Sequence, residues 1–253
     1  MSSVELKTRQ ELATMREAGR IVCEILDALE ELIAPGVSTG ELDALAERLT
    51  YQKGAQPAFK GYQGFPACLC ASVNDEIVHG IPSRTRRLEE GDLMKLDFGV
   101  QYRGFFGDAA RTVPVGRIGP DAQALVDVTR SALEKAIEQV VPGNRVGDVS
   151  WAVQQHVESH GFSVVQDFVG HGIGRHLHEA PQVPNFGEPG LGIPLRPGMV
   201  IAIEPMVSQG TGQVKLLDDH WTALTADRRL SAHFEHTVAV TDGPPDILTR
   251  RAG

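Results

Sequence analysis

The chain of 253 residues carries 24 Lys and Arg against 33 Asp and Glu, which gives a formal net charge of −9. With 42% hydrophobic and 23% charged residues, it has the composition of an ordinary globular protein. The acidic net charge argues against nucleic-acid binding driven by basic residues. The sequence contains no apolar run of about 18 residues, so no membrane span is predicted. The first residues lack the apolar core of a signal peptide, and three cysteines are too few for a disulfide framework. We therefore expect a cytoplasmic protein.

Two helices are expected at the start of the chain. One runs from Thr8 to Pro35, opens with a capping box and keeps a helical spacing of apolar residues. The other runs from Ser38 to Gly54 and opens in the same way. After them, β-forming residues and short turns predict strands, and helical patterns then return. The expected strands cover residues 67–78 and 93–115, the helices about 121–141 and 146–160, and strands and loops follow from 162, with a last apolar strand at 236–241.

An internal repeat links the two halves of the chain. The string Glu-Leu-Ile-Ala-Pro-Gly-x-x-x-Gly-Glu-Leu, ending at Leu42, parallels Glu-Gln-Val-Val-Pro-Gly-x-x-x-Gly-Asp-Val, ending at Val149. The same offset of 107 positions places the apolar run before Asp97 onto the run before Glu204. A Pro-Gly pair that recurs at helix ends would explain the first match but not the second. The sequence therefore predicts a duplicated architecture.

This repeat predicts an α+β fold in a single domain of residues 1–253, with halves at about 1–115 and 116–253. Each half would pack two helices on an antiparallel sheet, and a pseudo-two-fold axis would relate the halves. Asp97 and Glu204 would then lie close together near that axis.

Four carboxylates lie in apolar, strand-like surroundings. Asp97 and Glu204 each end a run that reads as buried, and two neighbouring buried anions need a cation or a shared proton. Asp108 follows Asp97, and a hairpin turn near Tyr102–Arg103 would place the two aspartates directly opposite each other. Glu235, in the apolar run from Ala232 to Val240, is the corresponding partner of Glu204. This pattern predicts carboxylates that coordinate the same metal ions.

Histidines complete the candidate site. His171 lies among three glycines and His178 follows it closely, so both are assigned to a site, whereas His156, His160 and His220 are taken as ordinary surface or core residues. Four carboxylates and one imidazole suit Mn(II), Fe(II), Co(II) or Zn(II), and a bridging carboxylate implies two ions about 3.5 Å apart. The excess of carboxylates argues against a two-histidine, one-carboxylate oxygenase.

The residues Asp97, Asp108, His171, Glu204 and Glu235, in that order, resemble the dinuclear site of the pita-bread metallopeptidases. Three local strings are similar to those of bacterial type I methionine aminopeptidases, and the resemblance covers nearly the whole chain. These strings are Ser72-Val-Asn-Asp-Glu-Ile-Val-His-Gly-Ile-Pro82, Gly170-His-Gly-Ile-Gly174 and Ile203-Glu-Pro-Met206.

The resemblance implies the pita-bread fold, two divalent ions of the Co, Mn, Fe, Zn or Ni class, and a role for each matching residue. Glu204 would relay the proton of the attacking water, His178 would stabilise the oxyanion, and His79 would contact the scissile peptide near its leaving nitrogen. One metal would be held by Asp97, Asp108 and Glu235, and the other by Asp108, His171, Glu204 and Glu235, with Asp108 and Glu235 bridging.

The resemblance also places the substrate methionine in an apolar pocket, whose positions are occupied here by Tyr62, Phe65, Cys70 and Trp221. For Cys70 a plain buried thiol, and for Trp221 a loop anchor, stay open as alternatives.

Five further positions concern fine specificity and ions. Phe59, Leu177 and His233 depart from the family pattern, which bears on substrate and inhibitor preference but not on the reaction. Asn74 and Ser231 resemble a site for one monovalent cation.

The implied activity is removal of the initiator methionine from nascent polypeptides when the second residue is small. A pita-bread aminopeptidase or prolidase of other specificity is the alternative, although fewer than 100 residues precede Asp97 and leave no room for the usual prolidase N-terminal domain. A non-catalytic binding protein of this fold would require lost ligands, and none of the five is lost. We expect a monomer that binds neither nucleic acid nor membrane; contact with the ribosome is left open.

Overall fold

The computed structural model describes residues 4–251. Both predicted N-terminal helices form, as α1 (Arg9–Leu32) and α2 (Thr39–Gln52), and both capping boxes are present. Thr8 accepts the backbone N–H of Glu11 while the Glu11 carboxylate accepts the Thr8 N–H, so two donors that a helix start leaves unpaired are satisfied.

The second pair of helices is α3 (Pro120–Glu138) and α4 (Val146–Ser159). Pro120 suits the first turn of α3 because its missing N–H has no partner to lose there. The bounds of α4 lie 107 positions after those of α2 at both ends, which is the offset of the sequence repeat. This agreement supports the proposed duplication.

The largest sheet has nine strands, and its main path runs β1-β4-β5-β14-β9-β7-β8, with β2 also paired to β4 and β15 to β14. Two separate sheets of three strands each, β13-β10-β6 and β11-β12-β3, complete the strands of the described residues. The strands are β1 (Gln56–Pro57), β2 (Leu69–Val73), β3 (Glu76–Val78), β4 (Leu93–Tyr102), β5 (Phe105–Pro114), β6 (Ser163–Val164), β7 (Val169–Gly172), β8 (Glu179–Pro184), β9 (Val200–Ile203), β10 (Met206–Ser208), β11 (Val214–Leu216), β12 (Ala223–Thr225), β13 (Ser231–His233), β14 (Glu235–Ala239) and β15 (Asp246–Ile247).

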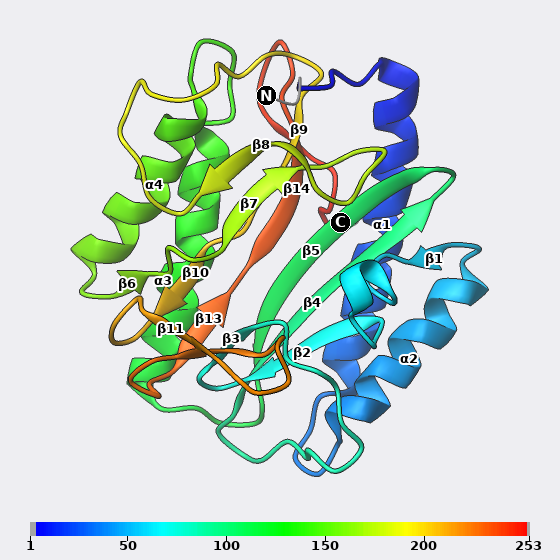
Figure 1. Ribbon diagram of the computed structural model, residues 1–253, viewed down its shortest axis with the longest axis vertical. Helices are drawn as coiled ribbons and strands as arrows, with labels where there is room; N and C mark the ends of the chain where they lie inside the picture. Colours follow the sequence, from blue (N-terminus) through cyan, green and yellow to red (C-terminus); the bar gives the residue numbers. More distant parts are fainter. Residues whose placement is uncertain (1–3, 252–253) are drawn as a thin grey trace.

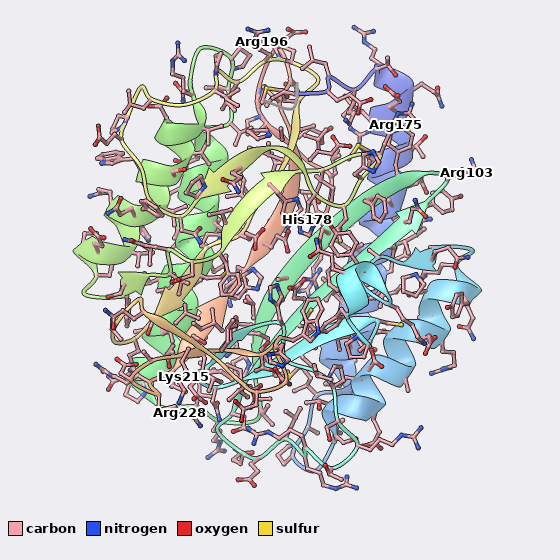
Figure 2. The ribbon with its side chains drawn as sticks, viewed as in Figure 1. Arg103, Arg175, His178, Arg196, Lys215 and Arg228 are labelled. Carbon is pink, nitrogen blue, oxygen red and sulfur yellow. The ribbon has the colours of Figure 1, made fainter. Side chains whose placement is uncertain are left out.

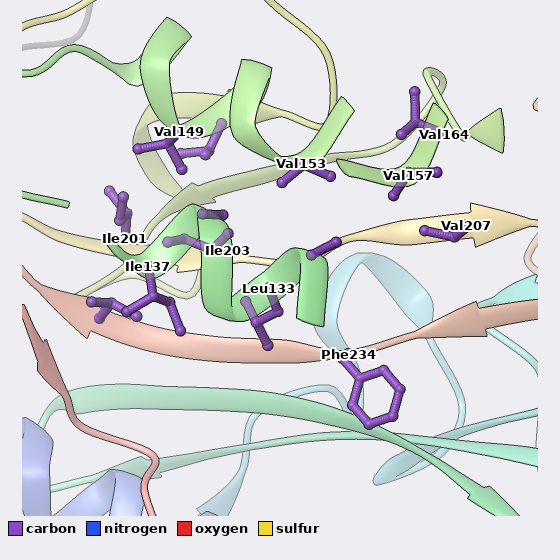
Figure 3. Close-up of a cluster of buried hydrophobic side chains, with 14 of the residues drawn as sticks. Leu133, Ile137, Val149, Val153, Val157, Val164, Ile201, Ile203, Val207 and Phe234 are labelled. Atoms are coloured by element: carbon purple, nitrogen blue, oxygen red, sulfur yellow. The ribbon is translucent and has the colours of Figure 1, made fainter. Parts of the chain in front are cut away.

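Each half of the main sheet carries its own helix pair and its own apolar core. Figure 1 shows α1 and α2 beside β4 and β5, and α3 and α4 on the opposite side beside β7 to β10. The first core packs Leu26 of α1 against Phe98 of β4. The second packs Leu133 of α3 and Val153 of α4 against Ile201 of β9 (Figure 3). The two halves meet where β5 pairs with β14.

The hairpin of β4 and β5 corrects the predicted register. Its turn consists of Arg103 and Gly104, both with positive φ (50° and 83°), which is the backbone of a tight two-residue hairpin turn. Asp97 therefore lies opposite Ala110, and Asp108 lies opposite Gly99, so the prediction that the two aspartates face each other directly was wrong. The turn is centred one residue later than predicted because glycine at 104 readily adopts the positive φ.

None of the helices within residues 4–251 combines the length and the apolar character needed to cross a bilayer.

Candidate metal centre and active site

The strand register gathers three of the predicted carboxylates on one face of the sheet. Ala110 in the middle pairs with Asp97 on one side and with Glu235 on the other, so all three side chains share a face. Asp108 lies two residues before Ala110 and therefore faces the same way. The carboxylates converge across the seam between the halves even though Asp97 and Asp108 are not direct partners.

The second half supplies the other two residues in the same way. His171 pairs with Ala202, and Ala202 pairs with Thr237. Because alternate residues of a strand share a face, His171 lies on the face of Glu204 and Glu235. The five predicted ligands thus point to one side of the sheet from both halves of the chain.

Distances within this group fit a metal centre. Asp108, His171 and Glu235 are buried, and each offers one ligand atom within 4.8 Å of the others. His171 Nε2 lies 3.6 Å from Glu204 Oε1, while its Nδ1 bonds to the carbonyl of Gly172 at 2.9 Å, which leaves Nε2 facing the carboxylates. Two buried oxygens, Asp108 Oδ1 and Glu235 Oε1, have no hydrogen-bond partner among the described residues.

The four carboxyl groups are costly to ionise together unless a cation lies between them. Burial, followed by repulsion from neighbouring carboxylates, raises the pKa of Asp97, Glu204 and Glu235 well above the ordinary range. Burial likewise raises the pKa of Asp108 to about 7. Burial lowers the pKa of His171 to about 3, so its ring is a neutral donor. Partnerless oxygens, crowded carboxyl groups and a neutral imidazole are a donor set that suits a divalent metal ion with mostly oxygen ligands.

A cavity of about 200 Å³ opens over these residues. Figure 2 shows His178 near the middle of the molecule, above the strands that carry the carboxylates. Its Nδ1 lies 2.7 Å from the Tyr62 hydroxyl, and its ring meets the ring of His171 at a centroid distance of 4.2 Å. The lining residues are Phe59, Tyr62, Gln63, Phe65, Cys70, Val78, His79, Asp97, Asp108, Phe168, Val169, His171, Leu177, His178, Glu204, Met206, Trp221 and Glu235.

His79 faces the cavity in a strained backbone conformation. Its φ is 60°, which is uncommon for a residue with a side chain and marks a position fixed by its surroundings. Its ring packs edge-on against Phe168 and Trp221. Burial lowers the pKa of His79 to about 4, so the ring is neutral.

All four residues predicted for the methionine pocket line the cavity. Phe65 and Trp221 meet edge to face at 5.1 Å between ring centroids, and Tyr62 adjoins His178. Cys70 is buried, and burial raises the pKa of its thiol well above the ordinary value, so it packs as a small apolar group. The sequence interpretation missed several wall residues; Met206 stands inside a quoted motif and could have been found there. The missed residues are Gln63, Val78, Phe168, Val169 and Met206.

The three departures from the family pattern take different places. Phe59 and Leu177 are wall residues of the cavity. His233 lies behind Glu204, with its Nε2 3.8 Å from Glu204 Oε2, and both ring nitrogens lack partners among the described residues. Burial lowers the pKa of His233 to about 3, so this ring is also neutral.

Asn74 and Ser231, the residues resembling a monovalent-cation site, lie away from the cavity wall. Their backbone carbonyls both accept hydrogen bonds from Lys95 Nζ, at 2.6 and 3.1 Å. Lys95 is 1% exposed, and burial lowers the pKa of its ammonium to about 7. The side-chain nitrogen of Lys95 thus contacts both residues that resemble a monovalent-cation site.

Residues 13–242 match metallopeptidase family M24. The chain belongs to this family. Among the relatives of this M24 chain, methionine aminopeptidase of Clostridium perfringens is 52% identical over 244 residues, covering 96% of this chain and 98% of the relative. Methionine aminopeptidase 1 of Bacillus subtilis is 50% identical with the same coverage.

Solved structures of the family share the fold. Methionine aminopeptidase of Thermotoga maritima superposes with a TM-score of 0.97 at 45% identity, covering 98% of the M24 chain and all of the other. A prolidase of Pyrococcus furiosus gives a TM-score of 0.80 at 25% identity and is matched over 66% of its length. These similarities confirm the pita-bread fold and the family resemblance.

Proposed function

We propose that this M24 chain is a metal-dependent aminopeptidase that removes the N-terminal methionine from polypeptides. The observation that carries the proposal is that methionine aminopeptidases match 96% of this chain at 50% to 52% identity. The five matching residues line a cavity of about 200 Å³ that also has aromatic and aliphatic walls and is large enough for one side chain. We extend the proposal to nascent polypeptides with a small second residue, and to a monomer in the cytoplasm.

The metal ligands are proposed as the resemblance implies. Asp97, Asp108 and Glu235 would hold one divalent ion, and Asp108, His171, Glu204 and Glu235 the other. The crowded, partnerless carboxylate oxygens support this assignment. Such ions, when bound, polarise a carbonyl and make water a nucleophile near neutral pH.

Three residues of the chain would carry the proton transfers and the positioning. Glu204 would take the proton of the attacking water and pass it to the leaving amine, because its carboxylate lies beside His171 at the cavity floor. His178 has Nδ1 engaged by Tyr62, which leaves Nε2 free to donate to the substrate carbonyl oxygen as negative charge develops on it. His79 would contact the scissile amide nitrogen from the fixed conformation described above.

The substrate methionine would lie among Tyr62, Phe65, Cys70 and Trp221. An unbranched thioether suits a pocket walled by aromatic rings and a buried thiol, since sulfur makes favourable contacts with ring edges. Prolidase activity is the less favoured alternative, because the prolidase similarity is lower in identity and spans only part of that enzyme.

Turnover of short peptides tests the function. We expect the metal-loaded protein to release methionine from Met-Ala-Ser, with a rate that falls as the second residue is enlarged from Gly to Leu. Asp108→Ala and His171→Ala should lower kcat by at least about 100-fold, a typical loss for a group that stabilises the transition state. Asp121→Ala, at an exposed position on α3, is the matched control and should leave kcat unchanged. Full activity in either site variant, or cleavage of Xaa-Pro peptides in place of Met-Ala-Ser, would refute the assignment.

A further inference from the structure

A long groove continues from the mouth of the cavity across the second half of the molecule. Its volume is about 1430 Å³, and it shares Val169, His171 and His178 with the cavity. The groove is therefore contiguous with the place where the proposed reaction occurs. Nothing in the proposed reaction at the first peptide bond requires this additional space.

One wall of the groove is strand β8, which begins at the residue directly after His178. Within the described residues, β8 is the last strand on its side of the main sheet. Pro181 and Pro184 suit such an edge strand, since proline cannot donate to a further strand partner. All residues of β8 except Val183 line the groove.

Part of the groove lining outside β8 is apolar and open to solvent. Phe186, Leu191 and Ile193 lie in the segment that follows β8, and their exposed fractions are 36%, 56% and 40%. Figure 1 shows this segment looping beyond β8 and over α4. Single exposed apolar side chains are common on any protein surface, whereas several gathered along one groove are typical of a binding surface.

We propose that this groove binds the substrate polypeptide beyond its second residue, in an extended conformation along β8, with a preference for apolar side chains. The inference rests on the proposed function, because the occupant is the part of the substrate that must leave the cavity past His178. The shared residues give continuity between the two sites. Six residues of β8 span about 20 Å, so the groove would accommodate about six substrate residues.

Matched peptides of two lengths test the proposal. The metal-loaded protein would be assayed with Met-Ala-Ser and with Met-Ala-Ser-Leu-Ile-Leu amide. We expect kcat/KM to be about three- to tenfold higher for the longer peptide, mainly through a lower KM, as burial of one or two apolar side chains predicts. Leu191→Glu should remove this advantage and leave turnover of Met-Ala-Ser unchanged. Leu216→Glu is the control, since Leu216 has the same exposed fraction but lies outside the groove.

A binding measurement that needs no turnover keeps the two proposals separate. The longer peptide would be acetylated at its N-terminus and labelled with a fluorophore at its C-terminus. An aminopeptidase cannot cleave it because it lacks a free N-terminal amine, so its fluorescence anisotropy reports binding alone. We expect Leu191→Glu and Ile193→Glu to weaken binding at least threefold, and Leu216→Glu to leave it unchanged. Equal kcat/KM for both peptides, or equal binding by all variants, would overturn the groove proposal. Failure to cleave Met-Ala-Ser, with binding retained, would overturn the proposed function alone.

Discussion

Asp108 depends on its neighbours for both its position and its charge. The Thr237 hydroxyl accepts the Asp108 backbone N–H at 3.1 Å and donates to the Asp108 carbonyl at 2.8 Å, so a residue of the second half fixes the backbone of a residue of the first. The Asp108 carboxylate oxygen Oδ1 is buried and has no hydrogen-bond partner among the described residues. A bound cation would offset the cost of burying this oxygen without a hydrogen bond.

Metal binding should release protons near neutral pH. Burial raises the pKa of Asp108 to about 7, and burial with repulsion from neighbouring carboxyl groups raises the pKa of Asp97, Glu204 and Glu235 well above the ordinary range, so we expect the metal-free protein to retain protons that a cation must displace. His171 contributes none, because its lowered pKa keeps it neutral. Metal affinity should thus rise with pH and fall as the pH drops below 7.

Calorimetric titration in buffers of different ionisation enthalpy measures this release. We expect about one to three protons per chain at pH 7, and fewer in Asp108→Asn. A binding enthalpy independent of the buffer would contradict the assignment of protonated carboxylates to the metal-free site.

At the scale of elements, the segment before α1 holds the loop that carries His178. Lys7 is almost fully buried, and its Nζ lies 2.7 Å from Glu179 Oε2. The other oxygen of Glu179 accepts the His176 N–H at 3.0 Å, so one carboxylate ties the loop to the N-terminal segment. In the sequence, His178 lies between His176 and Glu179, the two residues held by these contacts.

Breaking this ion pair should affect both stability and turnover. Lys7→Met leaves Glu179 largely buried without its cation, and we expect a loss of about 3 kcal/mol in the free energy of unfolding, measured with urea. The kcat for Met-Ala-Ser should also fall, because His178 loses its support. Lys53→Met breaks the more exposed pair with Glu24 and serves as the control, with a change below about 1 kcal/mol. Equal losses in the two variants would contradict a special role for Lys7.

Lys95 joins elements from the two halves. It extends from β4 to the carbonyls of Asn74, after β2, and Ser231, in β13. We expect this ammonium to make a free monovalent cation unnecessary. The midpoint temperature of unfolding should then be equal in potassium and tetramethylammonium chloride, whereas Lys95→Ala should be less stable and recover partly in potassium. A native protein that requires potassium would contradict this expectation.

At the scale of the whole molecule, the candidate metal centre lies on the seam between the halves. Asp97 and Asp108 come from β4 and β5, whereas His171, Glu204 and Glu235 come from the second half. Cation binding should therefore stabilise the association of the halves as well as the site. Without it, the four carboxylates, of which Asp108 and Glu235 are buried and Asp97 and Glu204 half-buried, crowd together at the seam where β5 pairs with β14.

Thermal unfolding measures this coupling. At a metal concentration 100 times the dissociation constant, linkage predicts about 2.7 kcal/mol of added stability, which corresponds to about 5–10 °C for a chain of this size. Asp108→Ala should lose most of the gain. An unchanged midpoint on metal addition to the native protein would exclude a metal centre at the seam.

The sequence by itself determined the helices and the family, and it predicted the candidate site residues that the structure then brings together. The capping boxes at Thr8 and Ser38 are local patterns of side chain and backbone, so they fix helix starts without any distant contact. The repeat can likewise be found along the chain. A carboxylate within an apolar run is also recognisable from the sequence, because a buried charge needs a compensating partner.

Only the tertiary structure decided how these residues meet. A turn displaced by one residue at Arg103–Gly104 changed the partner of Asp97, and the strand register across β5 and β14 then brought both halves to one face. The insertion of Lys95 between Asn74 and Ser231, and the groove along β8, join positions far apart in sequence. Such contacts depend on register and packing between distant segments, which no local spacing of residues encodes.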